Sequence, residues 1–346
     1  MKAAILYKPN EPLIVEELSI PSLKRGQVLV KVLFSGVCHS QLMEAKGLRG
    51  NDRYLPHLMG HEGVGVVVDI GPGVTKIKPD DKVVLGWIKG VGLEGGGAQF
   101  LTKTGVVINS GSVTTFSEMT IVSENRVVKF DSSIPDHVGV MFGCALPTGA
   151  GIMMNDINPR EGTTIAIFGL GGIGLSSLLS TSLFSFSRII AVDIEEEKLL
   201  IAKKLGATDL INSKNVDPLA VIKDLTSDEG VDYAIDASGL VSVIEQAFAS
   251  IKLKSGKLVF ASHPKYGDKI SIDPFELICG KKIIGSWGGG CNPDLDLPKF
   301  FSLYHSGKLP LDELLSKPYR LDDINEALGD LEKRKIIRAL IKMDKL

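Results

Sequence analysis

Hydrophobic and polar positions change their rhythm near residue 163 of this 346-residue chain. Before that point, short apolar runs rich in β-branched residues are separated by turn residues, as at Gly71–Gly73 and Lys78–Asp81. Short runs of this kind, bounded by glycine and proline, are typical of strands. The pattern therefore predicts an irregular, β-rich first domain, with strands at Gln27–Phe34, Gly63–Ile70 and Lys82–Leu85.

Beyond residue 163, β-branched segments alternate with helical segments. This alternation is typical of a parallel sheet with helices on both faces, in which ligands bind beyond the carboxyl ends of the strands. The predicted strands are Thr163–Phe168, Arg188–Val192, Asp209–Ile211, Val231–Ile235, Lys257–Ala261 and Lys282–Ser286. The predicted helices are Gly174–Phe186, Glu195–Leu205, Pro218–Leu225 and Ser242–Ile251. We therefore expect an α/β second domain built on a doubly wound parallel sheet.

The remaining residues have a helical pattern and end in Arg338–Met343, which predicts a strand that returns to the first domain. We therefore expect residues 1–145 and 288–346 to form one domain, interrupted by residues 146–287.

Composition excludes several classes of protein. Apolar residues make up 44% and charged residues 23%, close to the average of soluble globular proteins. The formal net charge of -2 gives no basic field, so no nucleic-acid partner is expected. The uncharged stretch Gly162–Ser187 contains several glycines, which favours a strand, a turn and a helix over a membrane span. Four cysteines without a close pair and an N-terminus without a long apolar run predict a cytoplasmic protein.

The segment Gly169–Gly174 has the pattern GxGxxG, and it follows a predicted strand and opens a predicted helix. In this context, glycines allow a tight turn, close approach of a pyrophosphate, and close packing of helix on strand. Asp193 follows Gly174 by 19 residues, at the end of the second strand, where its carboxylate can accept hydrogen bonds from the adenosine ribose. A carboxylate would repel a 2′-phosphate, so NAD(H) is favoured over NADP(H).

A possible metal site is suggested by Cys38, His61 and Cys144. Two thiolates and one imidazole would leave a tetrahedral zinc one ligand short, which is typical of catalytic zinc. Their wide spacing matches no zinc-finger pattern. From spacing alone, each residue could equally be an ordinary buried or surface side chain.

The segments Gly36–Ser40, Gly60–Gly73, Gly143–Gly149 and Gly169–Gly174 resemble, in this order, the zinc-dependent medium-chain alcohol dehydrogenases. The similarity extends over nearly the whole chain, to Arg338. The resemblance implies a Rossmann NAD-binding domain inserted into a GroES-like catalytic domain. It also implies a reversible, NAD-linked oxidation of an alcohol to an aldehyde or ketone by hydride transfer.

The resemblance also implies roles for individual residues. Cys38, His61 and Cys144 would hold one catalytic Zn²⁺ per chain. Ser40 would bond the alcohol oxygen and start the proton relay, and Glu62 would act as a transient zinc ligand behind the metal. Trp87 would form an aromatic wall of the substrate pocket.

The residues expected to contact NAD(H) are Gly169, Gly171, Gly172, Ile173, Gly174, Asp193, Lys198, Thr148 and Arg338. Among them, Thr148 would contact the nicotinamide side, and Lys198 would support the adenosine ribose. Arg338 and His39 would bind the pyrophosphate, and His39 could also receive the proton at the end of the relay.

Three departures from the family pattern bear on function. The segment Leu85–Ser110 contains no cysteine, so the second, structural zinc of many members should be absent. Gln41 stands where the family commonly has an Asp beside the zinc-bound His, and Met43 replaces a His that often passes the proton to solvent. Because of these changes, the resemblance does not determine the catalytic rate or the substrate.

Two other functions therefore remain as alternatives. One is a sugar, polyol, cyclitol or sugar-nucleotide dehydrogenase of the same family, and the other is a non-catalytic protein that binds zinc or dinucleotide. The expected partners are a small alcohol or carbonyl substrate and further copies of the chain. The resemblance implies a homodimer or homotetramer, often paired through an edge strand of the Rossmann sheet, and the β-rich segment Lys281–Trp287 is a candidate for that edge. No membrane association is expected.

Overall fold

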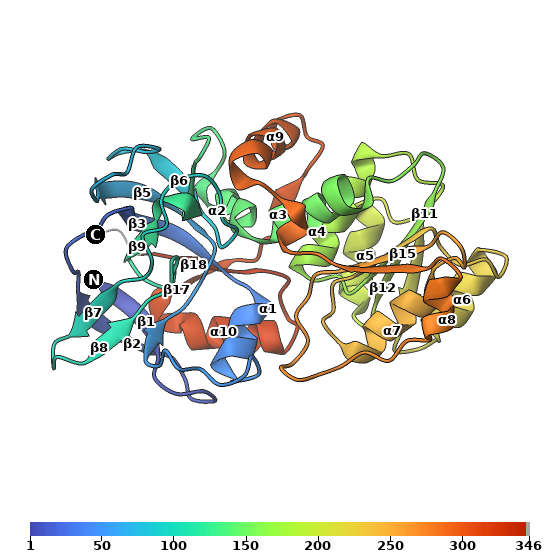
Figure 1. The fold of residues 1–346 in the computed structure, drawn as a ribbon, viewed down its shortest axis with the longest axis horizontal. Helices are drawn as coiled ribbons and strands as arrows, with labels where there is room; N and C mark the ends of the chain where they lie inside the picture. The colour runs from blue at the N-terminus through green and yellow to red at the C-terminus, as the bar shows by residue number, and fades with distance from the viewer. Residues whose placement is uncertain (344–346) are drawn as a thin grey trace. The chain divides into compact units, whose positions relative to one another are not determined.

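The computed structural model describes residues 1–343, which divide into two compact units. Unit 1 comprises Met1–Cys144, Asn292–His305 and the chain from Leu311 onward. Unit 2 comprises Ala145–Cys291 with the short segment Ser306–Pro310. The chain therefore leaves unit 1 after Cys144 and returns to it near the C-terminus (Figure 1).

Unit 1 is built on two antiparallel-rich sheets, one of which closes into a barrel. The barrel has the order β1 (Lys2–Leu6), β2 (Ile14–Ser19), β7 (Gln99–Thr102), β8 (Val107–Asn109) and β4 (His57–Leu58). The larger sheet has the order β10 (Val127–Lys129), β6 (Lys82–Leu85), β5 (Gly63–Ile70), β3 (Gln27–Val37), β18 (Ala339–Lys342) and β17 (Pro318–Arg320), with β9 (Met119–Ser123) paired to β3. Its helical segments are α1 (His39–Ala45), η1 (Glu124–Arg126), α2 (Asp136–Gly139), η2 (Val140–Gly143), α9 (Pro293–His305), η6 (Leu311–Leu314), η7 (Leu321–Asp323) and α10 (Ile324–Glu332).

The C-terminal strand completes the larger sheet of unit 1. Strand β18 runs antiparallel to β3, with Ala339 opposite Val37. This register places Arg338, just before β18, beside the end of β3 where Cys38 follows. Buried side chains of β3, β5, β6, α10 and β18 share one apolar core, so the two ends of the chain fold as one unit.

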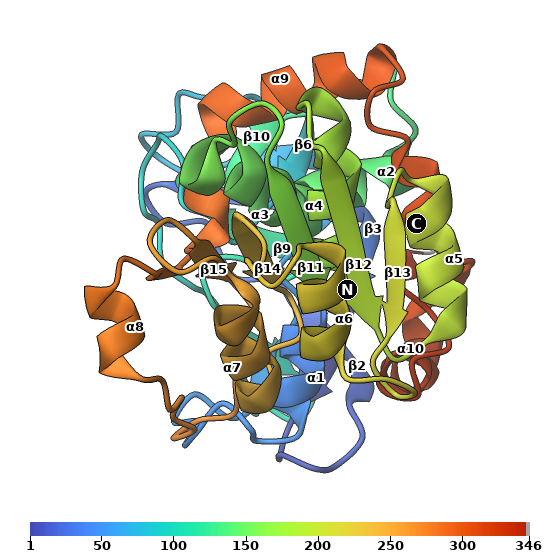
Figure 2. The same ribbon diagram turned by 90° about the vertical axis from the view of Figure 1, so that its right-hand side faces the viewer.

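Unit 2 is a six-stranded parallel sheet with the order β13 (Asp209–Asn212), β12 (Arg188–Asp193), β11 (Thr164–Phe168), β14 (Tyr233–Asp236), β15 (Lys257–Phe260) and β16 (Lys282–Gly285). Its helical segments are α3 (Ala145–Gly151), η3 (Ile152–Ile157), α4 (Gly172–Ser180), η4 (Thr181–Leu183), α5 (Glu196–Lys204), α6 (Pro218–Leu225), α7 (Val241–Ser250), α8 (Pro274–Ile278) and η5 (Gly288–Gly290). Helices α6 and α7 share an apolar core with one face of the sheet (Figure 2). The strand order reverses between β11 and β14, and ligands bind beside such a reversal in sheets of this type.

The predicted helix Gly174–Phe186 is wrong at its C-terminal end, because α4 stops at Ser180 and a short 3₁₀ turn follows. The hydroxyls of Ser180, Thr181 and Ser182 donate to the carbonyls of Ser176, Leu178 and Leu179. Such bonds offer the backbone an alternative to the helical ladder and tend to bend or end a helix. The uncharged stretch Gly162–Ser187 is thus a strand, a loop and a short helix, as predicted.

Within residues 1–343, no single helix combines the length and the apolar composition needed to cross a membrane. Two consecutive helical segments among these residues, Asp136–Gly143 and Ala145–Ile157, have the required length and apolar composition when they are counted together across the break between them.

Hydrogen bonds to two carboxylates hold the segment between β6 and β7 in place. Glu124 accepts the backbone N–H groups of Thr75, Lys76 and Leu93 at 2.6–2.8 Å. Glu94 accepts the hydroxyls of Ser112 and Ser123 at 2.8 and 2.7 Å. Burial opposes the charge of Glu94, but the bonds from Ser123 and Ser112 outweigh it and lower its pKa to about 2. Hydrogen bonds between protein groups therefore hold this segment, which contains no cysteine.

Candidate metal centre and dinucleotide loop

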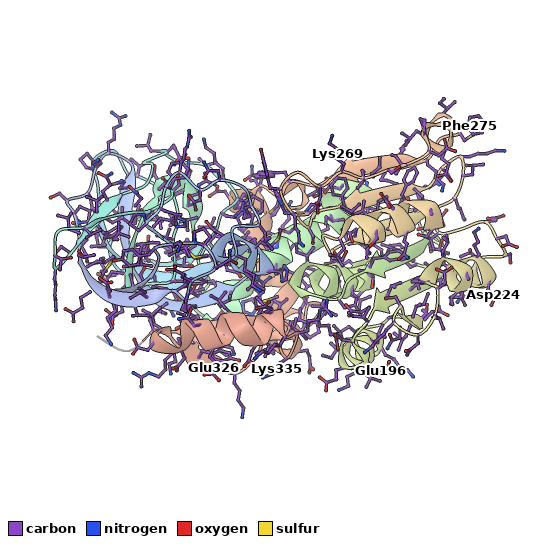
Figure 3. The ribbon with its side chains drawn as sticks, turned by 90° about the horizontal axis from the view of Figure 1, so that it is seen from below. Glu196, Asp224, Lys269, Phe275, Glu326 and Lys335 are labelled. Atoms are coloured by element: carbon purple, nitrogen blue, oxygen red, sulfur yellow. The ribbon has the colours of Figure 1, made fainter. Side chains whose placement is uncertain are left out.

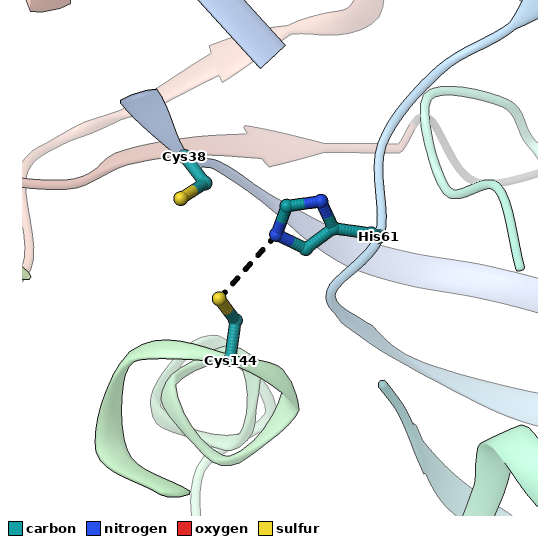
Figure 4. Close-up of side chains that lie close together, drawn as sticks. All are labelled: Cys38, His61 and Cys144. Carbon is teal, nitrogen blue, oxygen red and sulfur yellow. Dashed lines mark hydrogen bonds between the residues drawn. The ribbon is translucent and has the colours of Figure 1, made fainter. Parts of the chain in front are cut away.

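The structure brings together Cys38, His61 and Cys144, which sequence analysis predicted as ligands. Cys38 lies between β3 and α1, His61 lies just before β5, and Cys144 follows η2. One ligand atom of each lies within 4.8 Å of the others, and His61 Nε2 is 3.3 Å from Cys144 Sγ (Figure 4). Strands β3 and β5 pair with each other, so one sheet positions two of the three side chains. All three belong to unit 1.

The two cysteines of this cluster shift each other's pKa in opposite directions. The Cys144 thiol donates to the Cys38 sulfur and holds the pKa of Cys38 well below its usual range, with further help from His61 and Arg338. The negative Cys38 sulfur and burial raise the pKa of Cys144 well above its usual range. Cys38 is therefore the cysteine of the pair that loses its proton more readily, and the thiolate is the form of cysteine that binds metals.

Glu62 and Arg338 form a fully buried ion pair beside the cluster. Arg338 Nη1 donates to Glu62 Oε1 at 2.5 Å, and the two side chains are 3% and 0% exposed. Burial raises the pKa of Glu62, while the charges of Glu62, Cys38 and Cys144 outweigh burial and raise the pKa of Arg338. Glu62 Oε2 has no hydrogen-bond partner. One carboxylate oxygen of Glu62 is therefore bonded to Arg338, and the other remains available to a further ligand.

Two glycines make room for this ion pair. A Cβ on Gly36 would lie 2.6 Å from Glu62 Oε1, and a Cβ on Gly143 would lie 2.9 Å from Glu62 Cβ. Real Cβ atoms do not approach other atoms so closely. Gly36 and Gly143 are thus explained by the buried carboxylate behind the cluster.

Other predicted residues surround the cluster. Ser40 Oγ is buried and has no hydrogen-bond partner. The ring of Trp87 packs edge-to-face on His61, with centroids 6.5 Å apart. His39 is exposed at the start of α1, and Met43 is buried in the same helix.

Within residues 1–343, a second group of possible metal ligands comprises Glu44, Asp52 and His57. His57 is already bonded at both nitrogens, to Leu58 O at 2.9 Å and to Asp52 Oδ2 at 2.7 Å. This group contains no cysteine, whereas thiolate and imidazole together are the ligands that zinc prefers. The first cluster is therefore the better zinc site.

The loop Gly169–Gly174 has the geometry that the sequence predicted for it. Gly169 has φ +86°, a conformation that side chains rarely adopt, and a Cβ on Gly174 would lie 1.9 Å from Gly169 O. A Cβ on Gly171 would meet no atom within 4 Å. The first and last glycines thus satisfy the fold, while Gly171 keeps an open cradle at the N-terminus of α4. Backbone N–H groups at such a terminus are suited to phosphate.

Asp193 ends β12 beside this loop. Its Oδ2 accepts the N–H of Leu170 at 2.6 Å, and its Oδ1 accepts the N–H groups of Ile194 and Glu195 at 2.8 and 3.0 Å. The carboxylate therefore also supports the glycine loop, a structural role that the sequence analysis did not foresee. A carboxylate has about four lone-pair positions, so it can still accept a ribose hydroxyl.

The remaining predicted cofactor residues are placed as follows. Gly172 and Ile173 begin α4, Lys198 lies half-buried in the first turn of α5, and Thr148 is buried in α3. All of these belong to unit 2, whereas Arg338 belongs to unit 1 and contacts Glu62. The ion pair between Arg338 and Glu62, which lie 276 residues apart, was missed because no local signal links them.

Comparisons with known proteins agree with this architecture. Residues 24–136 match the family described as alcohol dehydrogenase GroES-like domain, and residues 172–305 match the family described as zinc-binding dehydrogenase. The chain is 31% identical to a probable S-(hydroxymethyl)glutathione dehydrogenase 1 of Schizosaccharomyces pombe, over 99% of this chain and 97% of that protein. It is 32% identical over 99% of this chain to the alcohol dehydrogenase-like 1 protein of Arabidopsis thaliana, of which it covers 96%.

Solved structures give the same result. The benzyl alcohol dehydrogenase of Acinetobacter calcoaceticus has a TM-score of 0.89 and 32% identity, with 99% of each chain covered. An alcohol dehydrogenase zinc-binding domain protein of Burkholderia ambifaria has a TM-score of 0.91 and 29% identity, again with 99% of each chain covered. The expected fold, a GroES-like catalytic domain with a Rossmann domain, is confirmed. The chain belongs to the zinc-dependent medium-chain alcohol dehydrogenase family.

Proposed function

We propose that this protein is a zinc-dependent oxidoreductase that uses NAD(H) to interconvert an alcohol with its aldehyde or ketone. The observation that carries the proposal is the cluster of two cysteines and one histidine, with the partnerless hydroxyl of Ser40 close to it in sequence. Three protein ligands leave one tetrahedral position for a substrate oxygen, as in catalytic zinc sites.

The residues at the site fit a zinc ion. Cys38, His61 and Cys144 would hold it, and the free Oε2 of Glu62 offers a further oxygen behind them. Two thiolates and Glu62 carry three negative charges, and Arg338 carries one positive charge, so a divalent cation would neutralise the cluster. When bound, zinc acts as a Lewis acid that makes an alcohol easier to deprotonate and a carbonyl easier to reduce.

The chain itself would supply the path of the proton. Ser40 Oγ would accept the hydrogen bond of the alcohol and pass its proton onward. Met43 has no group that carries a proton, and it is buried. We therefore assign the next step to water or to His39, the exposed neighbour of Ser40 in α1.

The dinucleotide would bind to unit 2. The open cradle at Gly171 would take the pyrophosphate, and Asp193 would accept the adenosine ribose hydroxyls. Because Asp193 would repel a 2′-phosphate, the preferred cofactor is NAD(H). NAD(H) supplies the hydride acceptor and donor, and the protein supplies binding and orientation.

The proposal is tested by following NADH absorbance with the zinc-loaded enzyme. We expect primary alcohols, including aromatic ones, to reduce NAD⁺, and NADP⁺ to be used much less well. The assay should cover polyols, sugars and sugar nucleotides in parallel. Turnover of polyols or sugars alone would favour the other branch of the family. A zinc-loaded enzyme with no turnover on any of them would favour a non-catalytic protein.

We also propose that two copies of the chain associate through the edge of the unit 2 sheet. Strand β16 ends that sheet, and an edge strand offers unpaired backbone groups to another chain. Apolar side chains beside it are exposed: Ile278 is 81% and Trp287 is 80% exposed, and Phe275 projects from α8 (Figure 3).

The double variant Ile278→Asp with Trp287→Asp should therefore reduce the mass in solution toward the 37.1 kDa of a single chain, because charges would be buried at the interface. Light scattering coupled to size-exclusion chromatography measures this mass. Leu295→Asp, at an exposed apolar position on α9, is the control and should leave the assembly unchanged. A wild-type protein that runs as a single chain would contradict the proposal.

A further inference from the structure

The segment that carries Trp87 has no regular secondary structure, so contacts with neighbouring segments determine where its ring lies. Trp87 follows the last residue of β6 by two positions and is half-buried. Its ring packs edge-to-face on His61, one of the proposed zinc ligands. A change in the backbone at Trp87 would therefore move an aromatic surface beside the candidate metal centre.

Main-chain hydrogen bonds place Arg126 next to this segment. Strand β10, which follows η1, pairs antiparallel with β6. The pairing continues beyond the strands, where the N–H of Gly86 donates to the carbonyl oxygen of Arg126 at 3.0 Å. The N–H of Gly90 donates to the carbonyl oxygen of Asn125 at 2.9 Å. The segment is thus attached to η1 on both sides of Trp87.

The side chain of Arg126 adds a bond to Trp87 itself. Its Nη1 donates to the carbonyl oxygen of Trp87, and its Nη2 lies 3.3 Å from Glu94 Oε2. The arginine side chain is only 17% exposed. A guanidinium is a planar, rigid fork that can serve two acceptors at fixed angles, whereas the ammonium of a lysine is a point charge on a flexible stem. Arg126 therefore links the main chain of Trp87 to Glu94.

Glu94 is a fixed anchor for this link. Its other oxygen, Oε1, accepts the hydroxyls of Ser112 and Ser123. The carboxylate is charged near neutral pH because its pKa is about 2, since the bonds from the two serines outweigh burial. One path of contacts thus runs from Glu94 through Arg126 to the carbonyl of Trp87.

We propose that Arg126 is a positioning residue that holds the ring of Trp87 against His61 and thereby selects the alcohols that fit beside the metal centre. Without the guanidinium, the carbonyl of Trp87 would lose this donor, and the ring would no longer have one fixed orientation. A flat aromatic alcohol packs on such a ring, whereas a short alcohol reaches it much less. The inference rests on the proposed function, because it takes Trp87 as a wall of the substrate site.

The first test observes the tryptophan ring in the metal-free protein. The chain has two tryptophans, Trp87 in unit 1 and Trp287 in unit 2, so labelling with 5-fluorotryptophan gives two ¹⁹F resonances. Arg126→Met should shift or broaden the resonance of Trp87 and leave that of Trp287 in place. The Trp87→Phe variant assigns the two signals. A Trp87 resonance that Arg126→Met leaves unchanged would overturn the proposal.

Lys89→Met is the matched control. Lys89 Nζ lies 3.9 Å from the same oxygen of Glu94, so this variant removes a cation beside Glu94 and keeps the bond from Arg126 to Trp87. It should leave both resonances close to those of wild type. Arg126→Lys keeps the charge without the planar fork, and it should move the Trp87 resonance in the same direction as Arg126→Met even if the latter folds poorly. Equal shifts in Lys89→Met and Arg126→Met would also refute the role of the bond to Trp87.

The second test compares two alcohols with the zinc-loaded enzyme. Arg126→Met should raise KM for benzyl alcohol about tenfold and change kcat less than about twofold, because a pocket contact acts on the bound substrate and on the transition state alike. KM for ethanol should change less than about twofold. Lys89→Met should leave both KM values near those of wild type. An equal rise of KM for the two alcohols, or no rise for either, would refute the selection of substrates by Arg126.

Failure of this inference and failure of the proposed function are distinguishable. The ¹⁹F experiment needs neither zinc nor turnover, so it judges the contact between Arg126 and Trp87 whatever the activity of the enzyme. A zinc-loaded wild type that oxidises no alcohol would instead refute the proposed function.

Discussion

Cys38→Ser should remove the zinc and reduce alcohol oxidation by at least about 10³-fold, because a Lewis acid contributes several kcal/mol to such a reaction. Serine replaces a thiolate of lowered pKa with a hydroxyl that stays protonated and binds zinc poorly. Metal analysis of the wild type should give about one zinc per chain. The variant should give almost none, and NADH absorbance should show the loss of rate.

Two controls make this result specific. His57→Gln alters the neighbouring group of Glu44, Asp52 and His57 and should leave both zinc content and rate near those of wild type. NADH binding, followed by fluorescence, should persist in Cys38→Ser because the glycine loop belongs to unit 2. Zinc that remains in Cys38→Ser but disappears in His57→Gln would mean that the metal occupies the other group.

Arg338→Met should lower the free energy of unfolding by about 3–5 kcal/mol, because it leaves Glu62 buried without its partner. The effect should be large since both side chains are almost fully buried and the pKa of Glu62 is already raised by burial. Chemical denaturation of the metal-free protein, followed by fluorescence and circular dichroism, measures it. Metal-free protein is used so that lost zinc binding does not add to the change.

Arg320→Met provides the matched control for this prediction. Arg320 lies 3.7 Å from Asp322 in an exposed pair of the same unit, and such pairs contribute about 0–1 kcal/mol. The double variant Glu62→Gln with Arg338→Met removes both charges and should recover part of the stability lost in Arg338→Met. Equal losses in Arg338→Met and Arg320→Met would contradict the view that the buried pair stabilises unit 1.

Local patterns predicted much of the fold of unit 2. The bounds of α6 agree with the prediction, and its N-terminus is explained by Asp217, which accepts the N–H of Leu219, and by Pro218 in the first turn. In unit 1, the predicted strands Gly63–Ile70 and Lys82–Leu85 are confirmed as β5 and β6. The closure of the barrel was not predicted, because it depends on pairings between distant strands such as β4 with β1. No local period in the sequence encodes such a pairing.

The candidate site likewise combines features that local sequence predicts with features that depend on tertiary structure. The glycine loop could be predicted because its strand, turn and helix are consecutive, and Gly169 and Gly174 meet local steric demands. Spacing alone left Cys38, His61 and Cys144 undecided, and only the resemblance singled them out. The contact of Arg338 with Glu62 follows from the register of β18 on β3, which is a tertiary property.

The two carboxylates that hold the segment between β6 and β7 have a consequence for how the protein responds to acid and to chelators. Hydrogen bonds lower the pKa of both Glu94 and Glu124 despite burial, that of Glu94 to about 2, so these contacts persist in mild acid. The contacts that hold this segment are hydrogen bonds between protein groups. A chelator that strips the proposed catalytic ion should therefore leave this part of unit 1 folded.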